Sequence, residues 1–214
     1  LFHMGVSNTR RCWNMFQLPE SVESACNVGC CGIDGCVSTL VGASLVNPDR
    51  LCYVVVGDLT FFYDLNSLGN HHIGTNLRVM LVNNGRGTEF RLGIHHCNVF
   101  GDDADKYMAA AGHFGNKSPL LVKHYAEDLG FHYLSATTKE EFMTALSNFT
   151  NPQLSDHSMI LEVFTDSKDE SEALYLMSHI QSDAKGMVRS KLKDAVRNVA
   201  GEKGINAIKK ILKK

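Results

Sequence analysis

Two short apolar runs, at residues 51–56 and 77–82, constrain the fold more than any other feature of the sequence. Both are rich in β-branched residues and lack a regular polar alternation, which is the pattern of parallel strands buried on both faces of a sheet. Strand-like and helix-like stretches alternate along the rest of the chain, without a repeat or a low-complexity linker. We therefore predict an α/β fold with a doubly wound, mostly parallel sheet and helices on both faces.

The remaining elements can be placed by pattern and by breakers such as Pro19 and Asn47-Pro48. A helix-like stretch separates the two buried runs, and a short apolar run opens the chain at 1–4. Further strands are predicted at 23–28, 131–134 and 159–164, and helices at 10–17, 36–46, 102–111, 120–129 and 139–149. A chain of 214 residues with 44% hydrophobic composition can bury one sizeable core, so we predict one domain over residues 1–180.

Residues 181–214 differ electrostatically from the rest, with ten Lys/Arg against three Asp/Glu. Their apolar residues recur at helical spacing on both sides of Gly201–Gly204. We predict a basic helical tail that packs on its own subunit or on a neighbour. The alternative is that it binds a membrane surface or an anionic partner.

Seven cysteines, an odd number, occur without a signal peptide or a bilayer-spanning run. Reduced thiols and a cytoplasmic location are the natural interpretation. The cluster formed by Cys26, Cys30, Cys31 and Cys36 has no paired C-x-x-C spacing and no nearby histidine, so we do not predict a zinc site there.

Both buried runs end in residues that a strand does not need, Gly57-Asp58 and Asn83-Asn84-Gly85. Ligands of such sheets bind beyond the carboxyl ends of the strands, so Asp58 and Asn84 converge if the two strands are neighbours. A carboxylate, an amide oxygen and a backbone carbonyl form part of the oxygen shell that Mg²⁺ prefers, completed by phosphate and water. Each pair alone is an ordinary turn or helix cap; together they favour a Mg²⁺-diphosphate site.

Gly57-Asp58, 24 further residues and then Asn83-Asn84 resemble the metal-diphosphate motif of thiamine-diphosphate enzymes. More narrowly, "NVGCCGIDGCVSTLVGA" and "VVVGDLTFFYDLNSL" resemble the C-terminal domain of the SEPHCHC synthases of menaquinone biosynthesis, which join a succinyl semialdehyde unit from 2-oxoglutarate to isochorismate. The resemblance covers residues 1–166. Leu59, where most of the wider family has glycine, agrees with the menaquinone branch.

The resemblance implies a cofactor, a metal and a set of residues that bind them. Mg²⁺ would be bound by Asp58 and Asn84 through side chains and by Arg86 through its carbonyl oxygen, and Ile33 would hold thiamine diphosphate in a bent shape. The full set of implied cofactor-binding residues is Gly32, Ile33, Gly57, Asp58, Leu59, Asn84 and Arg86. The cofactor acts as an electron sink in decarboxylation of a 2-oxo acid. A glutamate that activates the pyrimidine ring is expected in another, missing domain, so this domain alone should be inactive.

Two positions bear on the substrate. Val28 stands where the synthases usually have an arginine that grips a substrate carboxylate, and an isopropyl group cannot replace a guanidinium. Arg11 matches another substrate-facing arginine, although Arg10 beside it leaves the register open, and either could be a solvated helix charge. The acceptor therefore differs from that of the synthases, or its carboxylate is held from elsewhere.

We thus predict the cofactor-anchoring domain of a thiamine-diphosphate-dependent transferase or carboligase that works as a homo-oligomer without a nucleic-acid partner. The alternatives are a domain of a thiamine-diphosphate decarboxylase with another acceptor, a nucleotide- or phosphate-binding module, and a noncatalytic interaction domain. A nucleotide-binding module is disfavoured because the chain lacks G-x-G-x-x-G and a P-loop.

Overall fold

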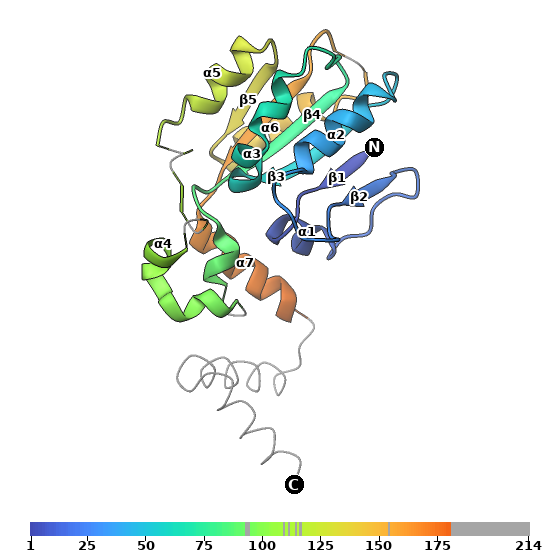
Figure 1. Cartoon of the computed structure of the whole chain (residues 1–214). Helices are drawn as coiled ribbons and strands as arrows, with labels where there is room; N and C mark the ends of the chain where they lie inside the picture. Colours follow the sequence, from blue (N-terminus) through green and yellow to red (C-terminus); the bar gives the residue numbers. More distant parts are fainter. Residues whose placement is uncertain are drawn as a thin grey trace.

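The structure, a computed structural model, describes residues 1–92, 95–108, 110, 112–113, 115, 117–153 and 155–180 (Figure 1). The basic tail predicted at 181–214 lies outside the described residues. The predicted domain boundary at residue 180 therefore stays a prediction.

One six-stranded sheet, with the order β2-β1-β3-β4-β6-β5, forms the centre of the molecule, and every neighbouring pair of strands is parallel. The chain begins at β1 inside the sheet, adds β2 on one side, and then crosses to β3 on the other. That reversal of direction defines a doubly wound sheet, and the predicted fold class is confirmed. The strands are β1 (Phe2–Met4), β2 (Ser24–Cys26), β3 (Cys52–Gly57), β4 (Leu77–Asn83), β5 (His132–Ala136) and β6 (Met159–Phe164).

Helices connect the strands and surround the sheet. Within the described residues none of them is both long enough and apolar enough to cross a bilayer. The α-helices are α1 (Asn8–Trp13), α2 (Cys36–Leu45), α3 (Asp58–Tyr63), α4 (Ala104–Tyr107), α5 (Leu121–Asp128), α6 (Lys139–Phe149) and α7 (Ser167–His179). The 3-10 helices are η1 (Leu65–Gly69), η2 (Thr88–Arg91) and η3 (His96–Asp103).

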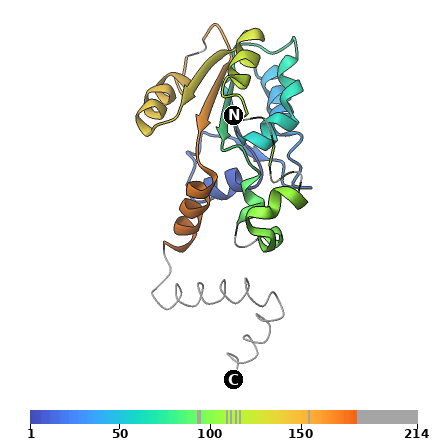
Figure 2. The ribbon, with the colours of Figure 1, turned by 90° about the vertical axis from the view of Figure 1, so that its left-hand side faces the viewer.

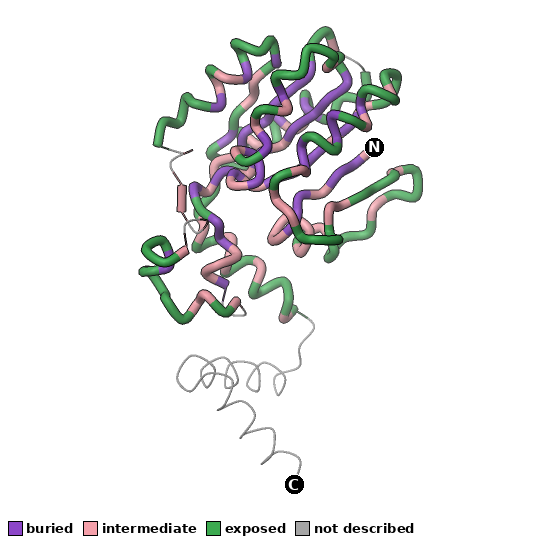
Figure 3. Tube along the Cα trace, viewed as in Figure 1, coloured by how far each residue is buried: buried purple, intermediate pink, exposed green. Residues whose placement is uncertain are grey.

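The two faces of the sheet have separate apolar cores because side chains alternate along each strand. The larger core joins α2, α3 and α5 to one face, where Val54 of β3 and Val79 of β4 lie opposite each other in the register. The smaller core packs α6 against the other face through Phe149 and Leu161. Figure 2 shows α6 on the opposite side of the sheet from α2 and α3, and Figure 3 shows the strands buried between exposed outer helix surfaces.

The observed elements follow most of the predicted ones. The helix at 139–149 and the strand at 159–164 have the predicted bounds. The helix predicted at 102–111 is wrong: among the described residues of that range the α-helix covers only Ala104–Tyr107, because η3 precedes it and Gly101 has a non-helical backbone with φ 52°. The helix predicted at 10–17 is shorter and begins earlier, at Asn8.

Helix α7 is an element that the sequence patterns did not predict. It follows β6 directly, and Asp166 caps it by accepting hydrogen bonds from the backbone N–H of Lys168 (2.8 Å) and Asp169 (3.1 Å). In Figure 1 it lies with α1 and α4 beyond the carboxyl ends of the strands. The end of the sheet where ligands of doubly wound folds bind is therefore partly covered by this helix.

Candidate functional site

Asp58 lies where β3 ends and α3 begins, with only 2% of its surface exposed. Its Oδ1 accepts a hydrogen bond from the backbone N–H of Leu59 at 2.9 Å. Its Oδ2 lies 2.8 Å from Nε2 of His113. A buried carboxylate requires such donors or a cation, and here it sits at the carboxyl edge of the sheet.

The tautomer of His113 follows from its second contact. The backbone N–H of Gly115 donates to Nδ1 of His113 at 2.9 Å, so this nitrogen carries no proton. The proton is then on Nε2, which donates to Asp58. The Asp58 carboxylate is thus held by a neutral imidazole and one backbone amide, and it has lone pairs left for a further ligand.

The turn after β4 contains two consecutive asparagines with the same local geometry. Oδ1 of Asn83 accepts from the N–H of Gly85 at 3.2 Å, and Oδ1 of Asn84 accepts from the N–H of Arg86 at 3.0 Å. Each is an Asx turn, in which the side chain replaces a backbone acceptor. Gly85 has φ 74°, a conformation that glycine adopts without strain.

Two glutamates fix the other end of each amide. Nδ2 of Asn83 donates to Oε1 of Glu162 at 2.7 Å, and Nδ2 of Asn84 donates to Oε2 of Glu170 at 2.8 Å. If oxygen and nitrogen were exchanged in either amide, the amide oxygen would lie against the glutamate carboxylate. The amide N–H group would then lie against the backbone N–H of the turn. The chemistry of the partners therefore determines the orientation of both asparagine side chains.

The surroundings of Glu162 and Glu170, the two carboxylates that contact the turn, shift their pKa values. Burial raises the pKa of Glu162, although hydrogen bonds from Asn83 and Tyr133 act in the opposite direction. The Tyr133 hydroxyl donates to Oε2 of Glu162 at 2.7 Å, and burial together with this contact raises the pKa of Tyr133. Burial likewise raises the pKa of Glu170, against hydrogen bonds from Thr165 and Asn84.

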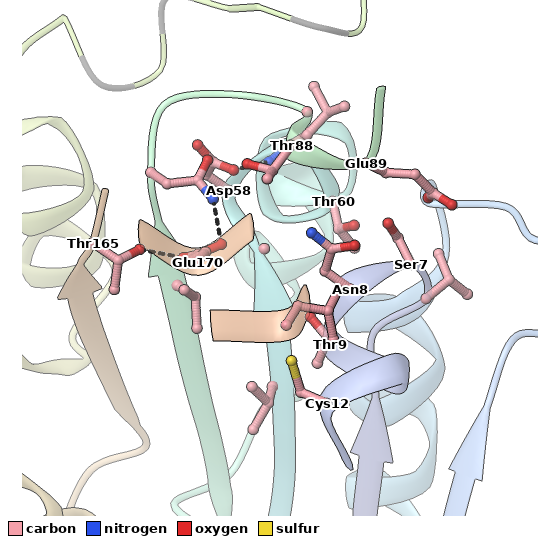
Figure 4. A pocket seen from close by; sticks show the side chains of 18 of the residues that line it. Ser7, Asn8, Thr9, Cys12, Asp58, Thr60, Thr88, Glu89, Thr165 and Glu170 are labelled. Atoms are coloured by element: carbon pink, nitrogen blue, oxygen red, sulfur yellow. Dashed lines mark hydrogen bonds between the residues drawn. The ribbon is translucent and has the colours of Figure 1, made fainter. Parts of the chain in front are cut away.

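A cavity of about 480 Å³ lies at this edge of the sheet. Figure 4 shows Asn8, Thr9 and Cys12 of α1 on one side of it and Glu170 of α7 on the other, near Asp58. Ala173, Leu174 and Met177 of α7 and Trp13, Met15 and Phe16 of the α1 segment add an apolar lining. The volume is in the range of small-molecule and cofactor sites, and most of its wall is apolar with a few polar groups.

The charged groups of the cavity are predominantly acidic. Among the residues that the structure describes, its lining contains the carboxylates of Asp58, Glu89 and Glu170 and one cation, Arg86, which is ion-paired with Asp105 at 3.4 Å. Glu89 is paired with Arg11 at 2.5 Å. Burial raises the pKa of Glu89, but hydrogen bonds from Arg11 and Ser7 outweigh it and hold that pKa below its ordinary value.

No protein-family model matches the sequence, but several curated proteins do, and they share the name 2-succinyl-5-enolpyruvyl-6-hydroxy-3-cyclohexene-1-carboxylate synthase. The protein from Bacteroides fragilis is 34% identical over 172 residues, which is 80% of this chain and 29% of that protein. Those from Phocaeicola vulgatus and Christiangramia forsetii are each 35% identical, over 175 and 174 residues, or 80% and 81% of this chain. This chain is a homologue of these synthases.

The relation to the synthases confirms the resemblance drawn from the sequence. The chain spans less than a third of the length of the curated synthases it matches, 29%, 29% and 28% for the three named above.

Most residues that the synthase resemblance singled out come together in the structure. Ile33, Gly57, Asp58, Leu59, Asn84 and Arg86 all line the cavity. Strands β3 and β4 are neighbours, as the convergence of Asp58 and Asn84 requires, with Gly57 opposite Val82 in the register. Ile33 also packs against the larger core.

Two predicted residues do not line the cavity. Gly32 is half-buried in the loop before Ile33 and lies outside the lining. Arg11 contacts Glu89 and Asn8, both of which line the cavity, but does not line it itself. The guanidinium of Arg11 donates to Glu89 and, at 3.2 Å, to Oδ1 of Asn8. Arg11 is therefore already paired within the chain. Val28 is 45% exposed and does not line the cavity either.

Sequence reasoning missed several polar residues of the site, among them Glu89 and Glu170 of the lining and His113, which contacts Asp58. The contact of His113 with Asp58 spans 55 residues, so no local pattern indicates it. Glu170 could have been found, because Asp166 followed by Asp169 and Glu170 is a helix-start signal. That signal would have placed an acidic helix end directly after the last strand.

Proposed function

We propose that the chain is the cofactor-anchoring domain of a longer thiamine-diphosphate-dependent enzyme resembling the SEPHCHC synthases. The homology with proteins of that name, over about four-fifths of the chain, supports the assignment. The synthases are more than three times as long as the matched region, and we propose that the rest of the enzyme supplies the pyrimidine-binding domain. This domain alone is then not expected to turn over substrate.

The residues at the strand ends fit a magnesium ion and a diphosphate. Asp58 offers a buried carboxylate with free lone pairs, Asn84 an amide oxygen in a fixed orientation, and Arg86 a backbone carbonyl. Such hard oxygen donors suit Mg²⁺, which completes its octahedral shell with phosphate oxygens and water. The open space beside the backbone of Gly57, where an added Cβ would meet nothing within 4 Å, leaves room for a phosphate.

The acidic cavity makes the metal necessary. Asp58 and Glu170 repel a diphosphate, whereas Glu89 is compensated by Arg11 and Arg86 is already paired with Asp105. A dication between Asp58 and the diphosphate reverses the local electrostatics. This acidic lining together with the Asp58–Asn84 convergence is the observation on which the proposal rests.

Thiamine diphosphate, when bound, supplies an electron sink for decarboxylation of a 2-oxo acid. Asp58, Asn84 and Arg86 would hold the metal that binds its diphosphate, and Ile33 would support the cofactor from the wall of the cavity. The apolar side chains of the α1 segment and α7 exclude water from the reacting centre.

The acceptor is the part of the reaction in which we expect a difference from the synthases. Arg11, the matching arginine, is engaged by Glu89 inside the chain, and Val28 offers no charge. We propose an acceptor substrate whose carboxylate is not bound by Arg11 or at position 28. We also propose that the enzyme is a cytoplasmic homo-oligomer. We propose a role in menaquinone biosynthesis as well, because the homologous proteins are named as SEPHCHC synthases.

Calorimetric titration of the 214-residue chain with thiamine diphosphate, with and without Mg²⁺, tests the proposal. Wild-type protein should bind weakly, and only with Mg²⁺. Asp58→Asn keeps the size of the side chain but removes the anionic ligand, so its Mg²⁺-dependent binding should disappear.

Asp128→Asn, an exposed change of the same kind on α5, serves as the matched control and should bind as wild type. Equal binding by wild type with and without Mg²⁺, or undiminished binding by Asp58→Asn, would contradict the proposed function.

A further inference from the structure

We infer that Glu170 of α7 is a positioning residue for the metal site: it holds the Asn84 amide so that its carbonyl oxygen is available to Mg²⁺. The inference rests on the proposed function, because Asn84 acts there as a metal ligand. The inference adds to the proposed metal site a contact between Glu170 and the ligand Asn84, made from a helix that the sequence patterns did not predict.

The Asn84 side chain has one partner at each end. Its Nδ2 donates to Oε2 of Glu170 at 2.8 Å, and its Oδ1 accepts from the N–H of Arg86 at 3.0 Å. The contact with the Arg86 N–H lies at an exposed position, where water competes for the same groups. The carboxylate of Glu170 accepts hydrogen bonds and cannot donate one when ionised, so it stabilises only the orientation in which nitrogen faces α7.

Glu170 is itself held in place from two directions. Oε1 of Glu170 accepts a hydrogen bond from the Thr165 hydroxyl. The N–H of Thr165 donates to the backbone oxygen of Asn83 at 3.1 Å, and Asp166 caps the first turn of α7. The end of β6, the start of α7 and the turn after β4 thus form one hydrogen-bonded unit.

Figure 4 shows the Glu170 carboxylate pointing into the cavity, close to Asp58, with dashed lines to Thr165 and to the neighbouring amide nitrogen. Glu170 therefore contacts the proposed ligand Asn84, and His113 contacts the other proposed ligand, Asp58, in the same way. Outer partners of this kind orient ligands and typically change metal affinity by about 10–100-fold when removed.

Three variants separate positioning from other roles. Glu170→Ala removes the acceptor and should weaken Mg²⁺ binding at saturating thiamine diphosphate by about 10–100-fold. Glu170→Gln keeps a carbonyl oxygen for Nδ2 of Asn84 and should retain most of the affinity. Glu172→Ala, an exposed change on the same helix, should bind as wild type.

A second readout needs no metal. In wild type and Glu170→Gln, the Asn84 side-chain amide protons should exchange slowly with solvent in ¹H–¹⁵N spectra, and in Glu170→Ala they should exchange rapidly. Thermal unfolding of the variants, followed by circular dichroism, verifies that each is folded.

The outcomes distinguish the two proposals. Wild-type protein without Mg²⁺-dependent binding would overturn the proposed function and this role with it. Wild-type binding that Glu170→Ala leaves unchanged or tightens would overturn only the role of Glu170. Equal losses in Glu170→Gln and Glu170→Ala would also overturn it, because they would indicate that the charge acts directly on the metal.

Discussion

At the scale of single residues, the turn after β4 depends on buried polar contacts. Asn83 and Glu162 are 3% and 1% exposed, and with Tyr133 they form a network in which each hydrogen-bonding group contacts another. A satisfied network of this kind makes a turn rigid, and a partly broken one destabilises it. The precision of the proposed metal site therefore depends on residues that do not line the cavity.

The raised pKa of Glu162 gives this network a pH dependence. The pKa of Glu162 in the folded state lies above its pKa in the unfolded chain. At pH values between the two, the folded state binds the proton more strongly than the unfolded state does. The free energy of unfolding then decreases as pH rises from about 4.3 through the raised value. Glu162→Gln removes this contribution, so its stability relative to wild type should increase as pH rises through the interval.

Urea unfolding at a series of pH values measures this difference. Glu20→Gln, a change at an exposed loop position, is the control and should parallel wild type. An identical pH slope for Glu162→Gln and wild type would show that Glu162 does not titrate as its burial indicates.

At the scale of elements, the chain makes its site by bringing the ends of β1, β3, β4 and β6 to one edge. The approach of β1 to β3 is close: the N–H of Gly5 donates to the backbone oxygen of Val55 at 2.7 Å. A Cβ at Gly5 would lie 2.9 Å from that oxygen and 3.2 Å from Cα of Val56. Gly5 thereby allows α1 to start where its side chains reach the cavity.

Gly5→Ala should force β1 and α1 away from β3 and lower the free energy of unfolding by about 1–3 kcal/mol, as overpacking does. It should also weaken Mg²⁺-dependent cofactor binding, since α1 forms a wall of the cavity. Gly42→Ala is the matched control. It lies within α2, has open space at its Cβ, and should be stabilised by about 0.5–1 kcal/mol. Denaturant titration that ranks the two variants in the opposite order would refute this explanation of the β1–β3 contact.

Sequence patterns predicted the elements that are buried and regular. β3 and β4 form the middle of the sheet, so their apolar runs are long and unambiguous, and the polar residues after them indicated the candidate site. α7 was missed because it has no buried residues and exposes apolar side chains such as Leu176. Contacts such as His113 with Asp58 and Glu170 with Asn84 depend on tertiary packing across 55 and 86 residues, which one sequence cannot reveal.

At the scale of the whole molecule, the doubly wound sheet explains how one domain brings the proposed metal ligands together. The parallel strands all end at the same edge, where two of them supply Asp58 and Asn84 and where α7 covers the cavity. The relation to synthases more than three times as long as the matched region is consistent with a domain that needs a partner for catalysis. The contribution that we propose for this domain is metal-dependent binding of the cofactor.

The most direct test is to replace Mg²⁺ by Mn²⁺ and to record pulsed electron paramagnetic resonance spectra of the 214-residue chain with thiamine diphosphate. Protein-bound Mn²⁺ should show hyperfine coupling to the ³¹P nuclei of the diphosphate, because one ion contacts both, and Asp58→Asn should abolish this signal. Mn²⁺ bound to the chain without ³¹P coupling, or coupling that Asp58→Asn leaves unchanged, would contradict a metal-diphosphate site at the ends of β3 and β4.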